Sequence, residues 1–201
     1  MPPSMVVNDL KALCDLIPRS MVPSSSPSRN AAHNSFHQRI RRETRSAHDI
    51  VDDAMSVFDL QDAEAYGRFL RHHAQALAAL RSQVRAEDKS DVQEMANRIE
   101  EDLRGLGVGE VVTASPPERL DGFGVAYVLR GSRMGARILR ARIGPGLPTR
   151  YMDFTPALTW RDFLAALETH AAGVHELGRR HIIVSAQWAF EAFGSARHSA
   201  A

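Results

Sequence analysis

The chain lacks several features that mark specialised classes of protein. Its 201 residues include one cysteine, Cys14, which excludes an internal disulfide framework and a cysteine-rich metal site. This cysteine usage fits a reducing compartment, and we expect a cytoplasmic protein. The formal net charge is only +1, so there is no excess of basic residues for general nucleic-acid binding.

Long apolar runs are missing as well. No run approaches the ~20 residues that a helix needs to cross a bilayer. The N-terminus has neither the basic start nor the continuous apolar core of a secretory signal, because polar and charged residues interrupt the stretch VVNDLKALCDLI. We therefore expect no membrane partner.

The first 35 residues differ in composition from the remainder. One short amphipathic stretch, residues 5–17, is followed by a segment rich in Ser and Pro, which buries too little apolar surface to offset its ordering entropy. We expect residues 1–35 to form a disordered tail. Residues 5–17 remain open to two interpretations, a docking helix or a weakly ordered leader. A short C-terminal tail, 196–201, leaves 36–195 as the folded domain.

From residue 36 onward the apolar residues recur with the period of an α-helix, and no segment shows sustained alternation of period two. The fold class that this predicts is an all-α, multi-helix bundle. Asp62 and Thr159 are the expected N-caps of two helices. Gly173 and Gly178 leave open whether the last helical region kinks or restarts. Helices are expected over residues 36–55, 62–80, 89–103, 121–143, 160–167 and 175–193.

His48 is the histidine whose position indicates chemistry. It lies on the apolar face of the first predicted helix, with Ala47 and Val51 beside it. An imidazole there is either a buried core residue or a metal ligand, and both interpretations are kept. The other histidines lack the spacing of a helical metal site. Three near the chain ends are expected to be solvated: His33, His37 and His198.

Two arginines precede His48 on or near the same helical face. Arg41 lies seven residues before it, about two turns back, and Arg45 lies three residues before it, about one turn back. Their guanidinium groups could pair bidentately with carboxylates of a ligand held by His48. The alternative is a solvated basic face.

A second segment, AYVLRGSRMGARIL, carries Gly131 and Gly135 inside a predicted helix. Glycine in a helix interior costs about 1 kcal/mol relative to alanine, so a pair separated by one turn needs a physical reason. One reason is close packing against another helix. The other is a flat ligand that must press against the backbone.

These two segments resemble a known family. TRSAHDIVD resembles the proximal helix of heme oxygenases, in which a Thr-basic-x-x-His pattern supplies the iron ligand. AYVLRGSRMGARIL resembles their glycine-bearing distal helix, particularly in the bacterial, bacteriophytochrome-associated branch, which typically reads Tyr-Val-Leu-Glu-Gly-Ser-x-Leu-Gly-Gly. The order of the segments and the C-terminal AQWAFEAF also agree. The resemblance covers roughly residues 36–195 and implies a heme-oxygenase-like helical domain.

The resemblance implies roles for particular residues. His48 would be the proximal iron ligand, and Gly131 and Gly135 would lie over the heme and contribute to catalysis. Arg41 and Arg45 would pair with the heme propionates.

Further roles and two departures from the family pattern follow the same resemblance. Arg161 is a candidate for another propionate contact, Ser132 falls at a position that orders distal water in some members, and Tyr127 could reach that water. Arg130 stands where the branch usually has Glu, and Ala136 where a second glycine is common. These two differences put turnover in more doubt than binding.

The activity implied is oxidative cleavage of heme to biliverdin, carbon monoxide and iron. Heme is then both substrate and cofactor, and O2 is the oxidant. Electrons must come from an external reductase or ferredoxin, because the chain has no flavin or iron–sulfur motif. A bacteriophytochrome is a candidate partner. The alternatives are a catalytically silent protein that binds heme or bilin, and a helical bundle without heme.

Overall fold

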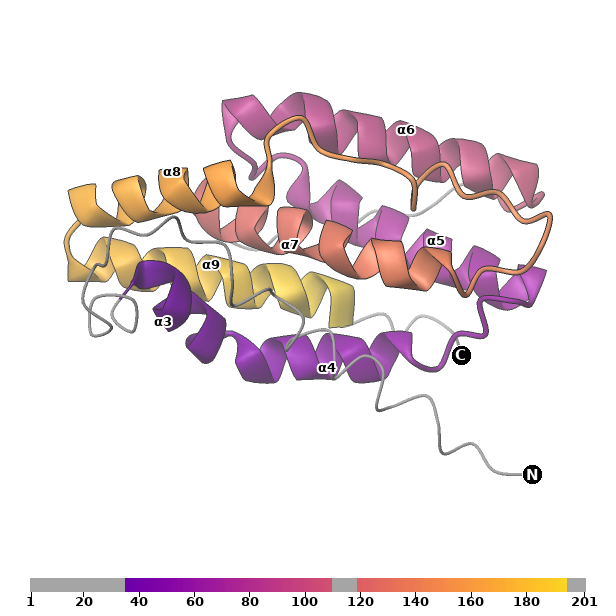
Figure 1. The fold of residues 1–201 in the computed structure, drawn as a ribbon, viewed down its shortest axis with the longest axis horizontal. Helices are drawn as coiled ribbons and strands as arrows, with labels where there is room; N and C mark the ends of the chain where they lie inside the picture. Colours follow the sequence, from indigo (N-terminus) through magenta and orange to yellow (C-terminus); the bar gives the residue numbers. More distant parts are fainter. Residues whose placement is uncertain (1–34, 110–118, 195–201) are drawn as a thin grey trace, which may run out of the picture.

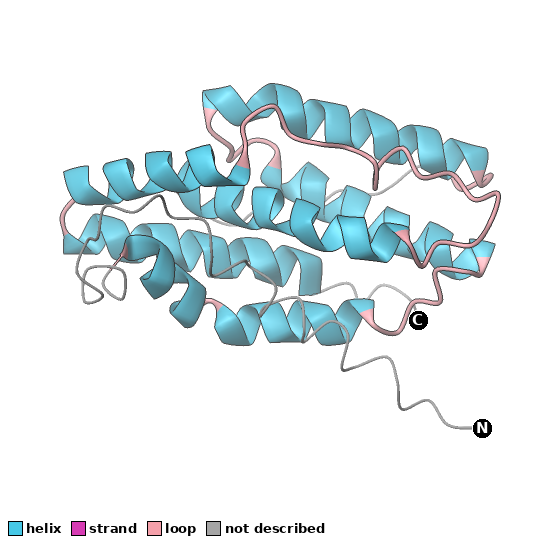
Figure 2. Ribbon diagram, viewed as in Figure 1, coloured by secondary structure: helices cyan, strands magenta, loops and turns pink. Residues whose placement is uncertain are grey.

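The computed structural model describes residues 35–109 and 119–194, and within these ranges the protein is entirely helical (Figures 1 and 2). The predicted all-α class is therefore confirmed. The predicted tails lie outside the described residues, apart from Ser35. The elements in chain order are α3 (Phe36–Glu43), α4 (Arg45–Met55), α5 (Ala63–Leu80), the 3-10 helix η1 (Ala86–Asp88), α6 (Lys89–Gly105), α7 (Gly122–Arg140), α8 (Trp160–Gly173) and α9 (Glu176–Gly194).

Helix starts follow from local capping. The Asp62 carboxylate accepts a hydrogen bond from the Ala65 backbone N–H (2.8 Å), and the Thr159 hydroxyl accepts one from Asp162 (3.2 Å). Each satisfies one of the amide groups that a first helical turn leaves without a partner. Both predicted caps are confirmed.

Helix α9 is the element that holds the bundle together. It contacts α4, α5 and α7, and α7 runs through the middle of the molecule between α9 and α6 (Figure 1). The closest approach is at Gly124 of α7, where a Cβ would lie 2.3 Å from the Ile182 carbonyl oxygen of α9. The apolar faces of the helices meet in one core. Among the described helices, none is long and apolar enough to span a membrane.

The structure differs from the predicted helices at two places. Residues 36–55 form two helices, because the backbone breaks at Thr44, whose hydroxyl donates to the Ile40 carbonyl (2.8 Å). Helix α7 ends at Arg140 instead of residue 143. Of the alternatives left open for the last helical region, the structure has a restart: Val174 is extended (φ −111°, ψ 151°), and α9 begins at Glu176.

Candidate functional site

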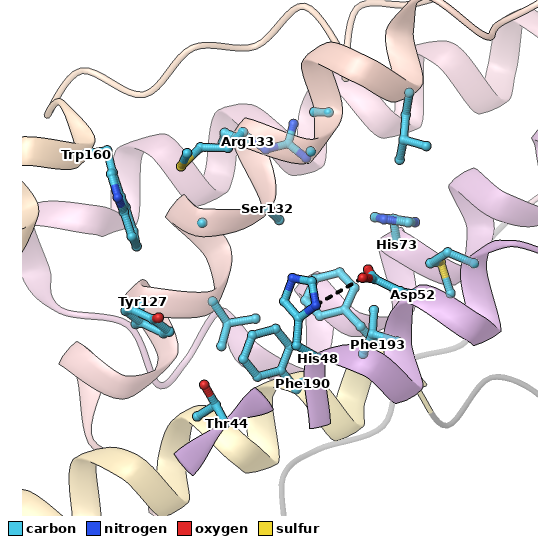
Figure 3. Close-up of a pocket in the computed structure, with 18 of the residues that line it drawn as sticks. Thr44, His48, Asp52, His73, Tyr127, Ser132, Arg133, Trp160, Phe190 and Phe193 are labelled. Atoms are coloured by element: carbon cyan, nitrogen blue, oxygen red, sulfur yellow. Dashed lines mark ion pairs between the residues drawn. The ribbon is translucent and has the colours of Figure 1, made fainter. Parts of the chain in front are cut away.

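An apolar pocket lies between α4 and α7, with α9 as its floor (Figure 3). Its volume is about 190 Å³. The polar residues at its walls include His48, Arg41, Arg45 and Ser132. Its apolar surface is made by side chains from four helices and one connecting segment: Val51, Met55, Tyr127, Val128, Met134, Ala136, Leu139, Met152, Trp160, Phe190 and Phe193.

The imidazole of His48 projects from α4 into this pocket (Figure 3). Its Nδ1 lies 3.1 Å from a carboxylate oxygen of Asp52, one turn later, without the alignment of a hydrogen bond. The ring packs edge-on against Phe190 of α9, with centroids 5.4 Å apart. A carboxylate beside Nδ1 favours the tautomer in which Nε2 carries the lone pair, the arrangement common to metal-binding histidines.

Asp49 is the other acid near His48. Each of His48, Asp49 and Asp52 offers one ligand atom, and these atoms lie within 4.8 Å of one another. Asp49 is exposed and lies 3.4 Å from the guanidinium of Arg45, so it is already part of a surface ion pair.

Both arginines predicted from the sequence border the pocket. Arg41 is half-buried and Arg45 is exposed, so their guanidinium groups lie where a ligand in the pocket would meet solvent. Arg161 is not brought to this site. Its side chain is 93% exposed and lies 3.6 Å from Asp162. The residue before it, Trp160, lines the pocket instead.

The glycines of α7 separate into two kinds. A Cβ on Gly131 would meet only the ring of Trp160, at 3.7 Å, which is ordinary van der Waals contact. Close helix packing therefore explains Gly124 but does not explain Gly131. Gly131, Gly135 and the buried methyl group of Ala136 all border the pocket, so α7 presents a wall of small groups opposite His48.

Ser132 and Tyr127 border the same wall. The Ser132 hydroxyl donates to the Leu129 carbonyl one turn back (2.8 Å), which leaves its lone pairs available to accept a hydrogen bond. Tyr127 is buried, with its ring 5.5 Å from that of Trp160. All the site residues predicted from the sequence, except Arg161, thus meet at one pocket.

Arg130 does not line this pocket and is buried behind it. Its Nε donates to Asp88 (2.8 Å), its Nη2 to Asp91 (3.0 Å) and its Nη1 to the Leu158 carbonyl (2.8 Å). The two carboxylates neutralise the positive charge of the Arg130 guanidinium. This departure from the resemblance therefore puts no free charge at the pocket, because the Arg130 side chain turns toward η1 and α6.

Three of the pocket residues that were not predicted from the sequence are aromatic or basic and come from different parts of the fold. Trp160 comes from α8. His73 comes from α5, and burial lowers its pKa to about 3, so it is neutral at pH 7. Arg133 is 7% exposed, and its guanidinium lies 4.3 Å from the centre of the Tyr151 ring and donates to the Tyr151 carbonyl (3.0 Å). The helical period could have placed His73 inside, but only the tertiary fold brings these three to the pocket.

The prediction that His37 is solvated is wrong. Its ring packs 6.2 Å from Tyr127 and 6.1 Å from Trp160, and its Nε2 is buried. Burial, together with the charge of Arg41, lowers its pKa. His33 and His198 lie outside the described residues.

Comparison with known proteins found no protein family and no curated protein that matches this chain. The functional assignment therefore depends on the pocket.

Proposed function

We propose that this protein binds heme between α4 and α7 and cleaves it oxidatively to biliverdin, carbon monoxide and iron. The observation that carries the proposal is the pairing of His48 with a wall of small residues across an apolar pocket. A flat macrocycle needs both an apolar slot and close approach to a backbone. The space beside Gly131, where an added Cβ would meet only the Trp160 ring at van der Waals distance, suits that need.

The donor groups of the pocket also fit a heme. His48 would hold the iron through Nε2, with Asp52 orienting the ring through Nδ1. Arg41 at the end of α3 and Arg45 at the start of α4, which both border the pocket, would pair with the two propionates. The apolar walls would exclude water from the macrocycle.

Bound heme would supply both the redox-active iron and the ring that is oxidised, with electrons from an external reductase or ferredoxin. The chain would contribute position and protons. The small groups of α7 would let its backbone come close to the heme on the side opposite His48. There Ser132 Oγ would accept a hydrogen bond from a water that delivers protons. His73 is neutral at pH 7, so it adds no charge to the pocket.

A hemin titration tests this proposal. The wild-type protein should take up one hemin per chain with a Soret band, and reductant with O2 should then replace that band by the red absorbance of biliverdin. His48→Ala should change the spectrum, whereas His181→Ala should not, because His181 is exposed on α9 outside the pocket. Wild-type protein that takes up no hemin would overturn the proposal, and an unchanged His48→Ala spectrum would remove His48 as the ligand.

The paired arginines allow a matched test of propionate binding. Removing both Arg41 and Arg45 should weaken hemin binding by about tenfold, on the order of 1.4 kcal/mol for two partly exposed charge-assisted contacts. Arg42→Ala is the control, because Arg42 follows Arg41 in α3 but is exposed and does not border the pocket. Equal losses for the double variant and the control would exclude a specific propionate site.

A catalytically silent heme- or bilin-binding protein is the second candidate. The observation that favours it is the buried methyl group of Ala136 at the pocket wall, where the resembling branch commonly has glycine. A Soret band that persists under reductant and O2 identifies this case. Ala136→Gly should then increase turnover.

A further inference from the structure

Trp160 is a pocket residue that reaches the site from α8, outside the α4–α7 pair. It is the first residue of α8, and its indole lies at the pocket beside α7 (Figure 3). A Cβ on Gly131 would be 3.7 Å from Cη2 and 3.9 Å from Cζ3 of the indole. The indole therefore occupies part of the space that the missing side chain leaves, and it bounds the pocket along α7.

The indole is held from several sides. It packs against Tyr127 of α7 (5.5 Å), Phe163 of α8 (5.6 Å) and His37 of α3 (6.1 Å, edge-on). Its Nε1 is buried without a hydrogen-bond partner among the described residues. Contacts from three helices fix one ring position, so Trp160 is a rigid boundary of the pocket.

The backbone before Trp160 is fixed by the buried ion pairs behind α7. Arg130, held by Asp88 and Asp91, also donates to the Leu158 carbonyl (2.8 Å). The next residue, Thr159, caps α8 and sets the direction in which the indole leaves the backbone. Arg130 is thus a positioning residue for Trp160.

A rigid ring at one end of a slot limits where a flat ligand can slide and turn. We propose that Trp160 is a specificity-determining residue: it fixes the in-plane orientation of the heme and thereby which meso carbon faces α7. This inference rests on the proposed function. It assigns the choice of biliverdin isomer to a side chain of α8, outside the two helices that hold the heme.

The test compares Trp160→Ala and the conservative Trp160→Phe with wild type, with Trp188→Phe as the control because Trp188 is partly buried on α9 but does not line the pocket. Paramagnetic NMR of the hemin complex measures the ratio of heme orientations, and chromatography of the bilin product measures the isomer ratio. We expect Trp160→Ala to change both ratios by about threefold or more, Trp160→Phe to change them less, and the control to leave them unchanged.

The outcomes separate this inference from the proposed function. If the wild-type protein takes up no hemin, both fail together. If the wild-type protein takes up hemin, and if Trp160 variants that keep the wild-type helical fold also keep the wild-type orientation ratio, the inference alone is overturned. Because the orientation ratio is measured on the resting complex, a protein that binds hemin without turnover still gives a decisive result.

Discussion

Gly124 and Gly131 of α7 lie about two turns apart in opposite surroundings. At Gly124, a Cβ would lie 2.3 Å from the Ile182 carbonyl oxygen and 2.9 Å from the Ala186 nitrogen. At Gly131, the nearest neighbour is a flat ring at contact distance. The first glycine is required by the fold, whereas the second is not.

This contrast predicts opposite effects of the same substitution. Gly131→Ala should raise the free energy of unfolding by about 1 kcal/mol, because alanine restricts the unfolded chain and the new methyl group meets no clash. Gly124→Ala should lower it by about 1–3 kcal/mol, because α7 and α9 must move apart. Urea unfolding measures both. A stability loss at Gly131 would contradict the assignment of that space to a ligand, and heme turnover should fall in Gly131→Ala despite its greater stability.

Arg130 shows how an element is positioned by a residue that does not touch the pocket. It joins α7 to η1, to α6 and to the segment before α8 through Asp88, Asp91 and the Leu158 carbonyl. Arg85 donates to the same Asp88 from the other side (2.6 Å). Within this buried group, each charge has a partner of opposite sign.

A glutamate at position 130, as is usual in the heme oxygenase branch that the sequence resembles, should therefore destabilise this protein. Arg130→Glu would place a third carboxylate beside Asp88 and Asp91, and we expect a loss of roughly 3–5 kcal/mol in unfolding free energy. Arg130→Met should cost less, since Asp88 keeps its contact with Arg85. Combining Asp88→Asn and Asp91→Asn with Arg130→Glu should recover part of the loss. If Arg130→Glu were as stable as wild type by urea unfolding, the buried ion pairs would not be what fixes α7.

For the molecule as a whole, buried histidines couple stability to pH. Burial lowers the pKa of His73 from about 6.5 to about 3, and it also lowers the pKa of His72, which hydrogen-bonds to the Phe193 carbonyl. The unfolded chain binds protons below pH 6.5 that the native protein excludes. The stability contributed by neutral His73 is therefore complete above pH 6.5 and is lost as the pH falls toward 3. Burial raises the pKa of Asp102, which has an effect of opposite sign on the pH dependence of stability.

Unfolding free energy should accordingly fall between pH 7 and pH 5, at up to about 1.4 kcal/mol per pH unit for each excluded proton. His73→Gln should show a shallower slope over this interval, whatever its stability at pH 7. His181→Gln, at an exposed position, should retain the wild-type slope. Urea unfolding at several pH values measures these slopes, and identical slopes for all three proteins would rule out His73 as a source of the pH dependence.

The helices and much of the site could be predicted from local sequence. Period and capping chemistry act within one or two turns, so Asp62 and Thr159 mark helix starts whatever the rest of the chain does. The same period placed His48 on an inward face. Spacing along the helix predicted over residues 36–55 likewise put Arg41 and Arg45 beside it, and both border the pocket although Arg41 belongs to α3.

Other features depended on residues distant in sequence. The break at Thr44 occurs where Gln187 of α9, 144 residues beyond Glu43, donates to the Glu43 carbonyl (2.8 Å), a contact that no local pattern encodes. Arg161 had a suitable charge but lies on the outer face of α8, and its neighbour Trp160 faces the pocket.

The sequence by itself determined the all-α class, the helix caps and the inward face of α4, because these depend on hydrogen bonds and side-chain spacing within a few residues. The tertiary structure decided that Arg130 is neutralised behind α7, that His73 and Arg133 reach the pocket, and that the space beside Gly131 is bounded by Trp160. The physical reason is that charge pairing and free space are properties of surfaces from several helices, which exist only once those helices have packed.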